Sequence, residues 1–494
     1  MSHKIYSRFI APALLMLCCA PLLAAGPELA QAPSLKSSGP PEWPGAFDDV
    51  YRVLLSNLRP PEPPFTTYYV LPGPKFAKEI YLWDTAFIAQ VWKWWDLGIA
   101  QQVFFPLFQF SRNGMLPHSL KQGPQFKDSQ PPVLSWSIWK LYQFNRDRAW
   151  LEKVYPYLRD YNDWLYRERR MANGLFFWDN RFESGIDNSP RFTNRSATKV
   201  IPMQKFAAID LCSYMVNDNL ALANMAETLG KNEDAAQYRK NAEELKVLVN
   251  KYLWDEKDGL YYDFDFGKNQ FVKVKSIASL TPLFAGIPDA AQAKRLRDHA
   301  LDPAEFNTLI PLPSVALDDP TYQLDMWRGP VWINTAYMVI LGMDDYGYKK
   351  EAAELSWNLV DGVYQVWKKT GKFYEFYHPQ KFEIKGVHRK TGDLGTNFDR
   401  GDAPTADFVG WTGLVDNLVI EVLFGLEKTG DKWTMTPNFP EAATGKLFTL
   451  SLPSDNLEIT LEIKSSDQIS ARVIQNQKAR VFELGPGNSA SWSE

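Results

Sequence analysis

Cysteine and histidine are both scarce in this chain. Its 494 residues include three cysteines and five histidines. Cys18 and Cys19 lie close to the N-terminus, in a segment that we expect to be removed, so the rest of the chain keeps only Cys212 and cannot form a disulfide of its own. A metal site built from histidine and cysteine is therefore not expected, and we predict a protein without a metal or other cofactor.

The sequence also lacks the motifs of several common enzyme classes. It has no G-x-G-x-x-G after a predicted strand, no P-loop, no H-E-x-x-H and no G-x-S-x-G. These absences argue against nucleotide, zinc-protease and serine-hydrolase chemistry. The net charge of −4 argues against nucleic acid or an anionic membrane as the partner.

The first 25 residues have the pattern of a secretory signal peptide. Lys4 and Arg8 precede an apolar run over 9–23, and small residues follow at 24–26. We therefore expect residues 1–25 to be cleaved and the protein to be periplasmic or secreted. No later segment is apolar over the length that a membrane-spanning helix needs, so we expect no membrane partner for the mature form.

Hydrophobic periodicity divides the remainder of the chain into three parts. Residues 26–45 are rich in proline, glycine and serine, which predicts a loose leader. Residues 46–430 predict paired helices, and residues 431–494 predict a small β appendage because polar and apolar residues alternate there. The clearest helical stripes cover 148–170, 211–229 and 232–252. The fold class that we expect is all-α.

Aromatic residues are unusually abundant. The chain has 18 Trp, 22 Tyr and 30 Phe. Such rings either form a large aromatic core or line a sugar-binding cleft, where a ring face stacks on the apolar face of a pyranose. Many of them lie in long loops over 111–131, 172–204, 302–330 and 371–408. Long loops in a compact helical domain are usually functional.

Two of these loops carry a candidate carboxyl group. Glycoside hydrolysis needs an acid that protonates the leaving oxygen and a second carboxylate that acts as base or nucleophile. Asp187 and Glu375 each lie among Gly, Pro and aromatic residues. A single acidic residue in such a loop usually caps or faces solvent, but two such loops together favour catalysis.

Five short segments resemble, in this order, glycoside hydrolase family 63 and its relatives. They are WDTAF at 83–87, SQPP at 129–132, ESGIDNSPR at 183–191, MWRGPVWI at 326–333 and FYEFYHP at 373–379. The relatives include bacterial α-glucosidases, glucosylglycerate and mannosylglycerate hydrolases and the processing α-glucosidase I, with the trehalases more distant. The resemblance extends from about residue 81 to residue 426, and it implies an (α/α)6 barrel.

The same resemblance implies roles for individual residues. The family's general acid matches Asp187 and its general base matches Glu375. Glu183 is the main competitor for the acid role, and we interpret it as a residue that shapes the loop. The residues expected to line the sugar pocket are Trp83, Asp84, Gln130, Trp178, Trp327, Arg328 and Trp332.

Some residues near these loops allow two interpretations. Arg328 either holds a sugar hydroxyl or pairs with a core carboxylate. His118 and His378 are interpreted as hydrogen-bonded structural histidines. The loop over 393–407 is rich in aspartate but lacks EF-hand spacing, so a solvated loop is favoured over a calcium site.

The sequence therefore predicts an exported inverting glycoside hydrolase that cleaves α-linked glucosides or related α-glycosides, with a small carbohydrate as its substrate. One alternative is a trehalase-like enzyme, although trehalases carry Gln-Trp-Asp-x-Pro where this chain has the sequence MWRGP at 326–330. The others are a sugar lyase or isomerase and a non-catalytic sugar-binding protein on the same barrel. Neither the linkage cleaved nor the oligomeric state follows from the sequence.

Overall fold

The structure of the protein is a computed structural model that describes residues 26–76, 79–121, 124–125, 128–192, 203–389, 403–485 and 487–493. The expected signal peptide, residues 1–25, lies outside the described residues, as do Asp393, Asp399 and Asp402 of the Asp-rich loop. Among the helices in the described ranges, none is both long enough and apolar enough to cross a membrane.

The chain is mainly helical from residue 43 to residue 423. The helices are α1 (Trp43–Asn57), α2 (Leu82–Trp92), α3 (Leu97–Gln102), α4 (Phe105–Gln109), α5 (Leu134–Asn145), α6 (Arg148–Glu168), α7 (Ile209–Thr228), α8 (Asn232–Tyr252), α9 (Ala290–Leu301), α10 (Ile333–Asp345), α11 (Lys349–Thr370) and α12 (Leu414–Asn417). The three stripes expected over 148–170, 211–229 and 232–252 are confirmed as α6, α7 and α8. The Asp147 carboxylate caps α6 by accepting a hydrogen bond from the Trp150 N–H.

Six segments of the described chain contact one another in a closed ring. Helix α2 packs on α5, α5 on α7, α7 on a 3-10 turn at Thr281–Leu283, that turn on α10, α10 on α12, and α12 on α2. Every residue of α2 is buried, as are most residues of α10. A helix that is buried on all sides lies between other elements, so these segments form an inner layer.

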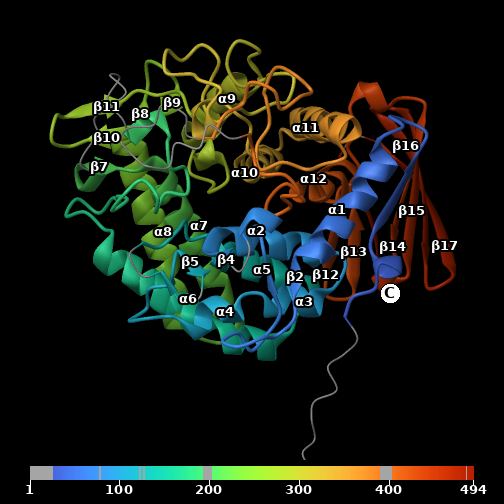
Figure 1. The fold of residues 1–494 in the computed structure, drawn as a ribbon, viewed down its shortest axis with the longest axis horizontal. Helices are drawn as coiled ribbons and strands as arrows, with labels where there is room; N and C mark the ends of the chain where they lie inside the picture. Colours follow the sequence, from blue (N-terminus) through green and yellow to red (C-terminus); the bar gives the residue numbers. More distant parts are fainter. Residues whose placement is uncertain are drawn as a thin grey trace, which may run out of the picture.

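A second layer of helices packs outside this ring. Helix α6 packs on α7, α8 on α7, α11 on α10, and α1 on α11. Both α6 and α11 bury one stripe of residues and expose the rest, as helices at the surface do. Figure 1 shows α2, α5, α7, α10 and α12 toward the middle, with α1, α6, α8, α9 and α11 farther out.

Strands from the end of the chain, together with β1 from its beginning, form two antiparallel sheets. The larger sheet has the order β1 (Ser34–Ser37), β14 (Lys446–Leu452), β15 (Leu457–Ser465), β16 (Gln468–Gln475) and β17 (Lys478–Leu484). The smaller sheet has the order β12 (Leu426–Thr429), β13 (Lys432–Met435) and β18 (Ala490–Ser493). Leu457, Ile459, Leu461 and Ile463 of β15 are buried, as their alternation predicts. Figure 1 shows both sheets at one side of the molecule, next to α1.

The segment expected to be a loose leader is part of this β region, which corrects the interpretation of residues 26–45. Strand β1 pairs with β14, and Leu35 lies opposite Leu450 with its side chain buried. The expected boundary at residue 430 also differs, because β12 begins at Leu426. The composition of this segment alone predicts a loop. The segment becomes a strand because its backbone hydrogen bonds satisfy the open edge of β14, which lies more than four hundred residues later in the chain.

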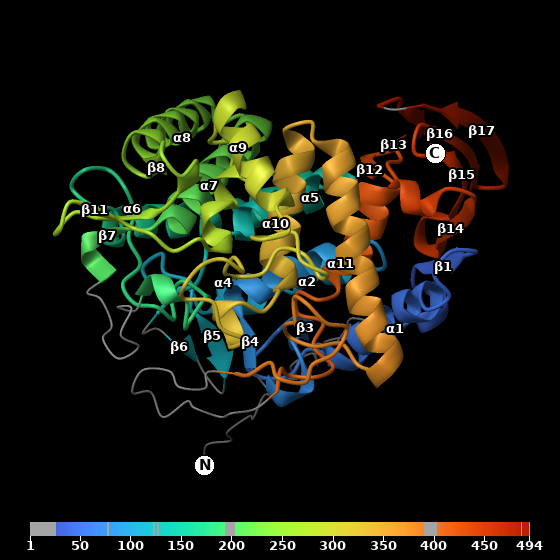
Figure 2. The ribbon, with the colours of Figure 1, turned by 90° about the horizontal axis from the view of Figure 1, so that it is seen from above.

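Short strands connect the helices. They are β2 (Leu58–Arg59) with β3 (Tyr69–Val70); β4 (Glu79–Tyr81) with β5 (Ser119–Lys121) and β6 (Pro124–Gln125); β7 (Phe206–Ala207) with β10 (Asp263–Asp265) and β11 (Gln270–Val272); and β8 (Trp254–Asp255) with β9 (Leu260–Tyr261). Figure 2 shows β4, β5 and β6 at the same end of the molecule as the orange loop that follows α11. This end carries the candidate site.

Candidate active site

One cavity collects most of the residues that the sequence assigned to the site. Its volume is about 490 Å³, which is in the range of small-molecule sites. Seven of the nine predicted site residues line it: Trp83, Asp84, Gln130, Asp187, Trp327, Trp332 and Glu375. They come from the start of α2, the start of α10 and the four long loops, so the tertiary structure brings these loops together.

The other two predicted residues, Trp178 and Arg328, are not among the residues that line this cavity. Trp178 is 1% exposed, and its Nε1 donates a hydrogen bond to Asp210 at 2.9 Å. The Arg328 guanidinium donates to the backbone oxygen of Asn188 at 3.3 Å. Trp178 therefore connects its loop to α7, and Arg328 connects the segment before α10 to the residue after Asp187.

The backbone on both sides of Asp187 is held in place. Gly185 has φ +73°, and a Cβ at this position would lie 2.6 Å from the ring of Trp83, so only glycine allows the loop to cross this ring. After Asp187, the side-chain oxygen of Asn188 accepts a hydrogen bond from the backbone N–H of Trp327 at 2.9 Å. Asp187 thus lies between two positions that are fixed to two tryptophans of the cavity wall.

A buried ion cluster anchors the end of the same loop. Arg191 donates to Asp210 at 2.6 Å and to Asp263 at 3.2 Å, and the side chains of all three are at most 3% exposed. Asp263 also accepts the Ile209 N–H at 2.9 Å, which connects the loop to the first residue of α7. Burial raises the pKa of Asp263 to about 6, against the lowering effect of the Arg191 charge. The cluster attaches the loop to α7 and to β10.

Tryptophans form the wall of the cavity. Trp327 and Trp332 stack with ring centroids 3.7 Å apart and an interplanar angle of 6°. Trp83 lies 6.0 Å from Trp327, and Trp411 lies 5.7 Å from Trp83 and 5.4 Å from Trp332. Sequence reasoning did not single out Trp411, which follows the last of the five motifs. Part of the aromatic abundance therefore belongs to a sugar-sized cavity and not only to the core.

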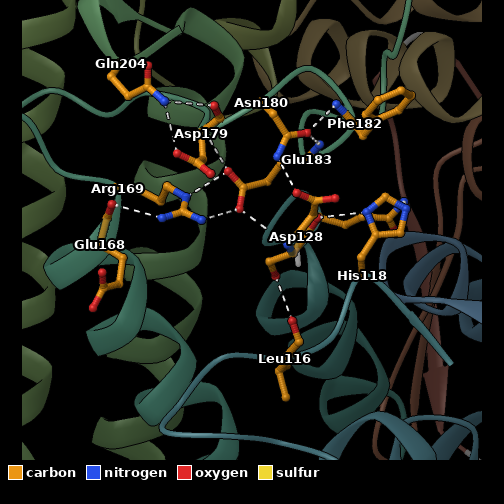
Figure 3. A network of polar contacts seen from close by, with 12 residues as sticks. Leu116, His118, Asp128, Glu168, Arg169, Asp179, Asn180, Phe182, Glu183 and Gln204 are labelled. Atoms are coloured by element: carbon orange, nitrogen blue, oxygen red, sulfur yellow. Dashed lines mark hydrogen bonds and ion pairs between the residues drawn. The ribbon is translucent and has the colours of Figure 1, made fainter. Parts of the chain in front are cut away.

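Glu183, the competitor for the role of acid, is fully engaged in structural contacts (Figure 3). Arg169 donates to both of its oxygens at 2.8 Å, the Asp179 N–H donates at 2.8 Å and the Ser129 N–H donates at 3.3 Å. The side chain is 1% exposed and does not line the cavity. Glu183 thereby connects the loop before Asp187 to the segment that carries Gln130, which agrees with a loop-shaping role.

His118 lines the cavity in a neutral, hydrogen-bonded state. Its Nδ1 lies 3.1 Å from the Ser129 carbonyl and its Nε2 lies 3.2 Å from the Gln130 amide nitrogen. A carbonyl accepts and an amide nitrogen donates, so Nδ1 carries the proton. Burial lowers the pKa of His118, which fits this state. His378 lies outside the cavity and accepts the Gln380 N–H at 3.1 Å.

Glu375 is held by its own backbone and by a residue that the sequence did not reveal. Its N–H donates to the Thr405 carbonyl at 2.9 Å, and its carbonyl accepts from Trp411 Nε1 at 2.8 Å. Its carboxylate forms an ion pair with Arg389, which also lines the cavity. The only sequence signal for Arg389 was its place in the long loop 371–408, because the pairing depends on how that loop folds back.

Asp84 is a third carboxyl group in the cavity. It lies in the first turn of α2 and is 3% exposed. Burial, followed by the negative charges of Glu375 and Asp187, raises the pKa of Asp84 well above its ordinary range. The dependence on both charges shows that the three carboxyl groups lie close enough to interact. A protonated Asp84 can donate a hydrogen bond from its O–H group, and the hydroxyl oxygen of a sugar can accept it.

Replacing Asp84 by Asn is expected to raise Tm at neutral pH. Because the pKa of Asp84 is higher in the folded state, the folded chain binds more protons than the unfolded chain above about pH 4, and the free energy of unfolding falls as pH rises toward the raised value. Each unit by which the pKa is raised corresponds to a loss of about 1.4 kcal/mol in the free energy of unfolding. Asparagine does not ionise, so the variant does not suffer this loss. Thermal unfolding of both proteins at several pH values checks this: the Tm difference should grow as the pH rises from about 4 toward neutrality, whereas a difference independent of pH contradicts it.

Of the aspartates in the loop over 393–407, the structure describes only Asp407. Asp407 accepts a hydrogen bond from the Lys372 ammonium at 2.7 Å. Within the described ranges, no group of three or more His, Cys, Asp or Glu side chains is arranged to hold a metal ion.

The chain is similar to a set of known carbohydrate enzymes. A family model described as the mannosylglycerate hydrolase MGH1-like glycoside hydrolase domain matches residues 78–398. The mannosylglycerate hydrolase of Thermus thermophilus is 28% identical over 381 residues, which cover 62% of this chain and 90% of that protein. The periplasmic trehalase of Escherichia coli is 23% identical over 441 residues, which cover 78% of this chain and 74% of that protein.

Two further similarities extend this comparison. An uncharacterized protein of Borreliella burgdorferi is 25% identical over 256 residues, so the chain spans about half the length of that relative. The crystal structure of a GH63 mannosylglycerate hydrolase from Thermus thermophilus in complex with glucose has 25% identity and a TM-score of 0.61, and the match covers 74% of this chain and 98% of that one. Because the family model covers more than half of the chain, the protein is a glycoside hydrolase that belongs to the mannosylglycerate hydrolase MGH1-like family and is related to the trehalases.

Proposed function

We propose that this protein is an exported, inverting glycoside hydrolase that cleaves α-linked glucosides or related α-glycosides, with Asp187 as general acid and Glu375 as general base. One observation carries the proposal. Asp187 and Glu375, which come from loops far apart in the sequence, line the same aromatic-walled cavity and both act on the pKa of Asp84.

The fold that we propose for the helical part is the (α/α)6 barrel. The closed ring of α2, α5, α7, the turn at Thr281–Leu283, α10 and α12 supplies the inner layer, and its contacts with the outer helices supply the second. In five positions the inner member is a helix, and in the sixth it is a short 3-10 segment. Residues 1–25 direct export, and the strands from β12 onward form, together with β1, an appendage packed on the barrel.

The acid role suits Asp187 better than Glu183. An acid must face the leaving oxygen, and Asp187 lines the cavity whereas Glu183 does not. Glu183 also accepts four hydrogen bonds, two from Arg169 and one each from the Asp179 and Ser129 N–H groups, so both of its oxygens are engaged in structural contacts. In the reaction, Asp187 transfers its proton to the glycosidic oxygen as the bond to the anomeric carbon breaks.

The base role suits Glu375. Its Oε2 accepts hydrogen bonds from Arg389 and from the Thr405 N–H, while no described residue donates to its Oε1. Oε1 therefore remains for a water molecule, whose proton it takes as the water oxygen attacks the anomeric carbon. Attack from the face opposite the leaving group inverts the configuration at that carbon.

The sugar ring is held by the remaining residues of the wall. Trp83, Trp327 and Trp332 give the cavity an apolar wall, in which Trp332 is itself stacked between Trp327 and Phe376. Asp84 and Gln130 supply hydrogen-bonding groups for hydroxyls. Trp178 and Arg328 act on the sugar indirectly, through the loop that carries Asp187.

The second candidate substrate is α,α-trehalose. It is favoured by the similarity to the periplasmic trehalase, which extends over 78% of this chain against 62% for the mannosylglycerate hydrolase. The run at 326–330 departs from the trehalase sequence, because Arg328 stands where trehalases have Asp. We therefore rank glucosides and glycosylglycerates before trehalose.

A substrate screen with NMR detection tests this function. The mature protein is incubated with α-linked glucose disaccharides, glucosylglycerate, mannosylglycerate and trehalose, and the first-formed anomer is read before mutarotation. Release of the β-anomer from an α-linked substrate is the expected result. Release of the α-anomer contradicts inversion, an unsaturated product that absorbs in the ultraviolet indicates a lyase, and binding of sugars without any product indicates a non-catalytic protein.

A further inference from the structure

Arg389 is a buried cation in the wall of the cavity. Its side chain is 14% exposed, its guanidinium donates to Glu375 Oε2, and it lies 5.8 Å from the ring centroid of Phe76. The preceding residue, His388, donates to the Leu324 carbonyl and accepts from the Met326 N–H, both at 2.9 Å. These two backbone hydrogen bonds attach the segment before Arg389 to the loop that precedes α10, so the guanidinium is held against Glu375.

The contacts of Glu375 are different for its two oxygens. Oε2 accepts from Arg389 and, at 3.4 Å, from the Thr405 N–H. Among the described residues, none donates to Oε1. Two donors on one oxygen set the rotation of the carboxylate and leave the other oxygen available to a further donor.

Most of the other charged groups around Glu375 are negative. Asp84 on α2 interacts with Glu375, and it also interacts with Asp187 and with Glu79 of β4. Of the other cations in the wall, Lys121 is 55% exposed and pairs with Glu79 at 3.4 Å, and Lys75 lies at the 3-10 turn before β4.

The charge of Arg389 responds to the same carboxylates. Burial opposes its charged form, but the charges of Glu375 and Asp187 outweigh this effect and raise the pKa of Arg389. The attraction is mutual, so the charge of Arg389 also acts on the carboxylate of Glu375, with which it forms an ion pair.

We infer that Arg389 is a positioning residue for the base: its guanidinium holds Glu375 in the ionised form and turns Oε1 toward the attacking water. The inference rests on the proposed function, since it gives Arg389 its role through Glu375. A general base works only while it is ionised, so loss of Arg389 confines activity to higher pH. Arg389 itself forms and breaks no bond in the reaction.

The test is the pH dependence of kcat and of kcat/KM for the wild type, Arg389→Met and Arg389→Lys, on the substrate that the screen identifies. For Arg389→Met we expect the acid limb of both profiles to move up by about 1–3 pH units, the range by which an adjacent arginine shifts a carboxyl group. Below the limb, kcat/KM then falls about tenfold for each unit of the shift. Arg389→Lys keeps a positive charge and should return the limb most of the way to the wild-type position.

Arg148→Met is the matched control. Arg148 pairs with Glu152 on α6, is 53% exposed and lies outside the cavity, so its loss removes one ion pair without moving the acid limb. Thermal unfolding checks that each variant is folded. If Arg389→Met is not folded, the comparison of Arg389→Lys with the wild type serves as the test.

Two results would overturn the inference. One is an acid limb of Arg389→Met that coincides with the wild type. The other is a rise of KM at every pH with kcat unchanged, which would place Arg389 on the substrate instead of on Glu375. The failure of the proposed function looks different, because there the wild type itself releases no sugar or releases it with retained configuration.

Discussion

Glu375→Gln and Asp187→Asn are each expected to lower kcat by about 10²–10⁴-fold, because each removes one of the two proton transfers in the reaction. Each amide keeps the size of the side chain and part of its hydrogen bonding, so the fold should survive. The double variant should not lose the product of the two factors, because residues that act in one step are not additive. Steady-state kinetics of the three variants measures these losses.

Leaving groups separate the two roles. A glycosyl fluoride departs with little protonation, so Asp187→Asn should recover part of its turnover on this substrate. Glu375→Gln should not recover, because its missing step is the activation of water. Glu244→Gln, on the exposed side of α8, is the control and should match the wild type on both substrates. Recovery of Glu375→Gln instead of Asp187→Asn would mean that the two roles are reversed.

Glu183→Gln is expected to lower the free energy of unfolding by about 3–5 kcal/mol, the cost of removing one partner of a buried ion pair. In the wild type, the Glu183 carboxylate accepts two hydrogen bonds from Arg169, whose side chain is 11% exposed. The variant leaves the charge of Arg169 without this carboxylate. It also weakens the bonds to the Asp179 and Ser129 N–H groups, so the loops on both sides of the cavity lose their connection. Urea unfolding of the wild type and the variant measures the difference.

The double variant Glu183→Gln with Arg169→Met supplies the comparison. If the loss comes from an uncompensated charge, removal of that charge restores part of the stability, so the double variant should be more stable than Glu183→Gln alone. A Glu183→Gln protein as stable as the wild type would contradict the structural role. A folded Glu183→Gln protein that recovers on glycosyl fluorides, beside a normally active Asp187→Asn, would move the acid to Glu183.

Helix positions were predictable from the sequence because their cause is local. The apolar stripes of α6, α7 and α8 repeat at the spacing of a helical turn, and this spacing depends only on residues a few positions apart. The alternation in β15 is local in the same way, and its buried residues are the ones predicted. Family motifs then identified seven residues of one cavity without any contact being known.

Strand β1 and the two predicted residues that do not line the cavity show the limit of this reasoning. The residues of β1 form a strand because β14 offers an open edge, and β14 lies more than four hundred residues later. Trp178 and Arg328 are of residue types that suit a sugar pocket. Whether such a side chain reaches the cavity depends on how its loop packs against the rest of the protein, which the sequence pattern does not show. Here Trp178 donates to Asp210 and Arg328 donates to the Asn188 carbonyl, and neither is among the residues that line the cavity.

The sequence by itself determined the mainly helical fold, the strands at its end, and the carboxyl and aromatic groups that are available for chemistry, because periodicity and motifs are properties of short segments. Only the tertiary structure decided which of these groups share one space. It placed Asp187 and Glu375 in the same cavity, engaged Glu183 with Arg169, and set Arg389 on Glu375. Electrostatic interactions act over a few ångströms of space whatever the distance along the chain, so the charge environment of the proposed base exists only once the loops are folded together.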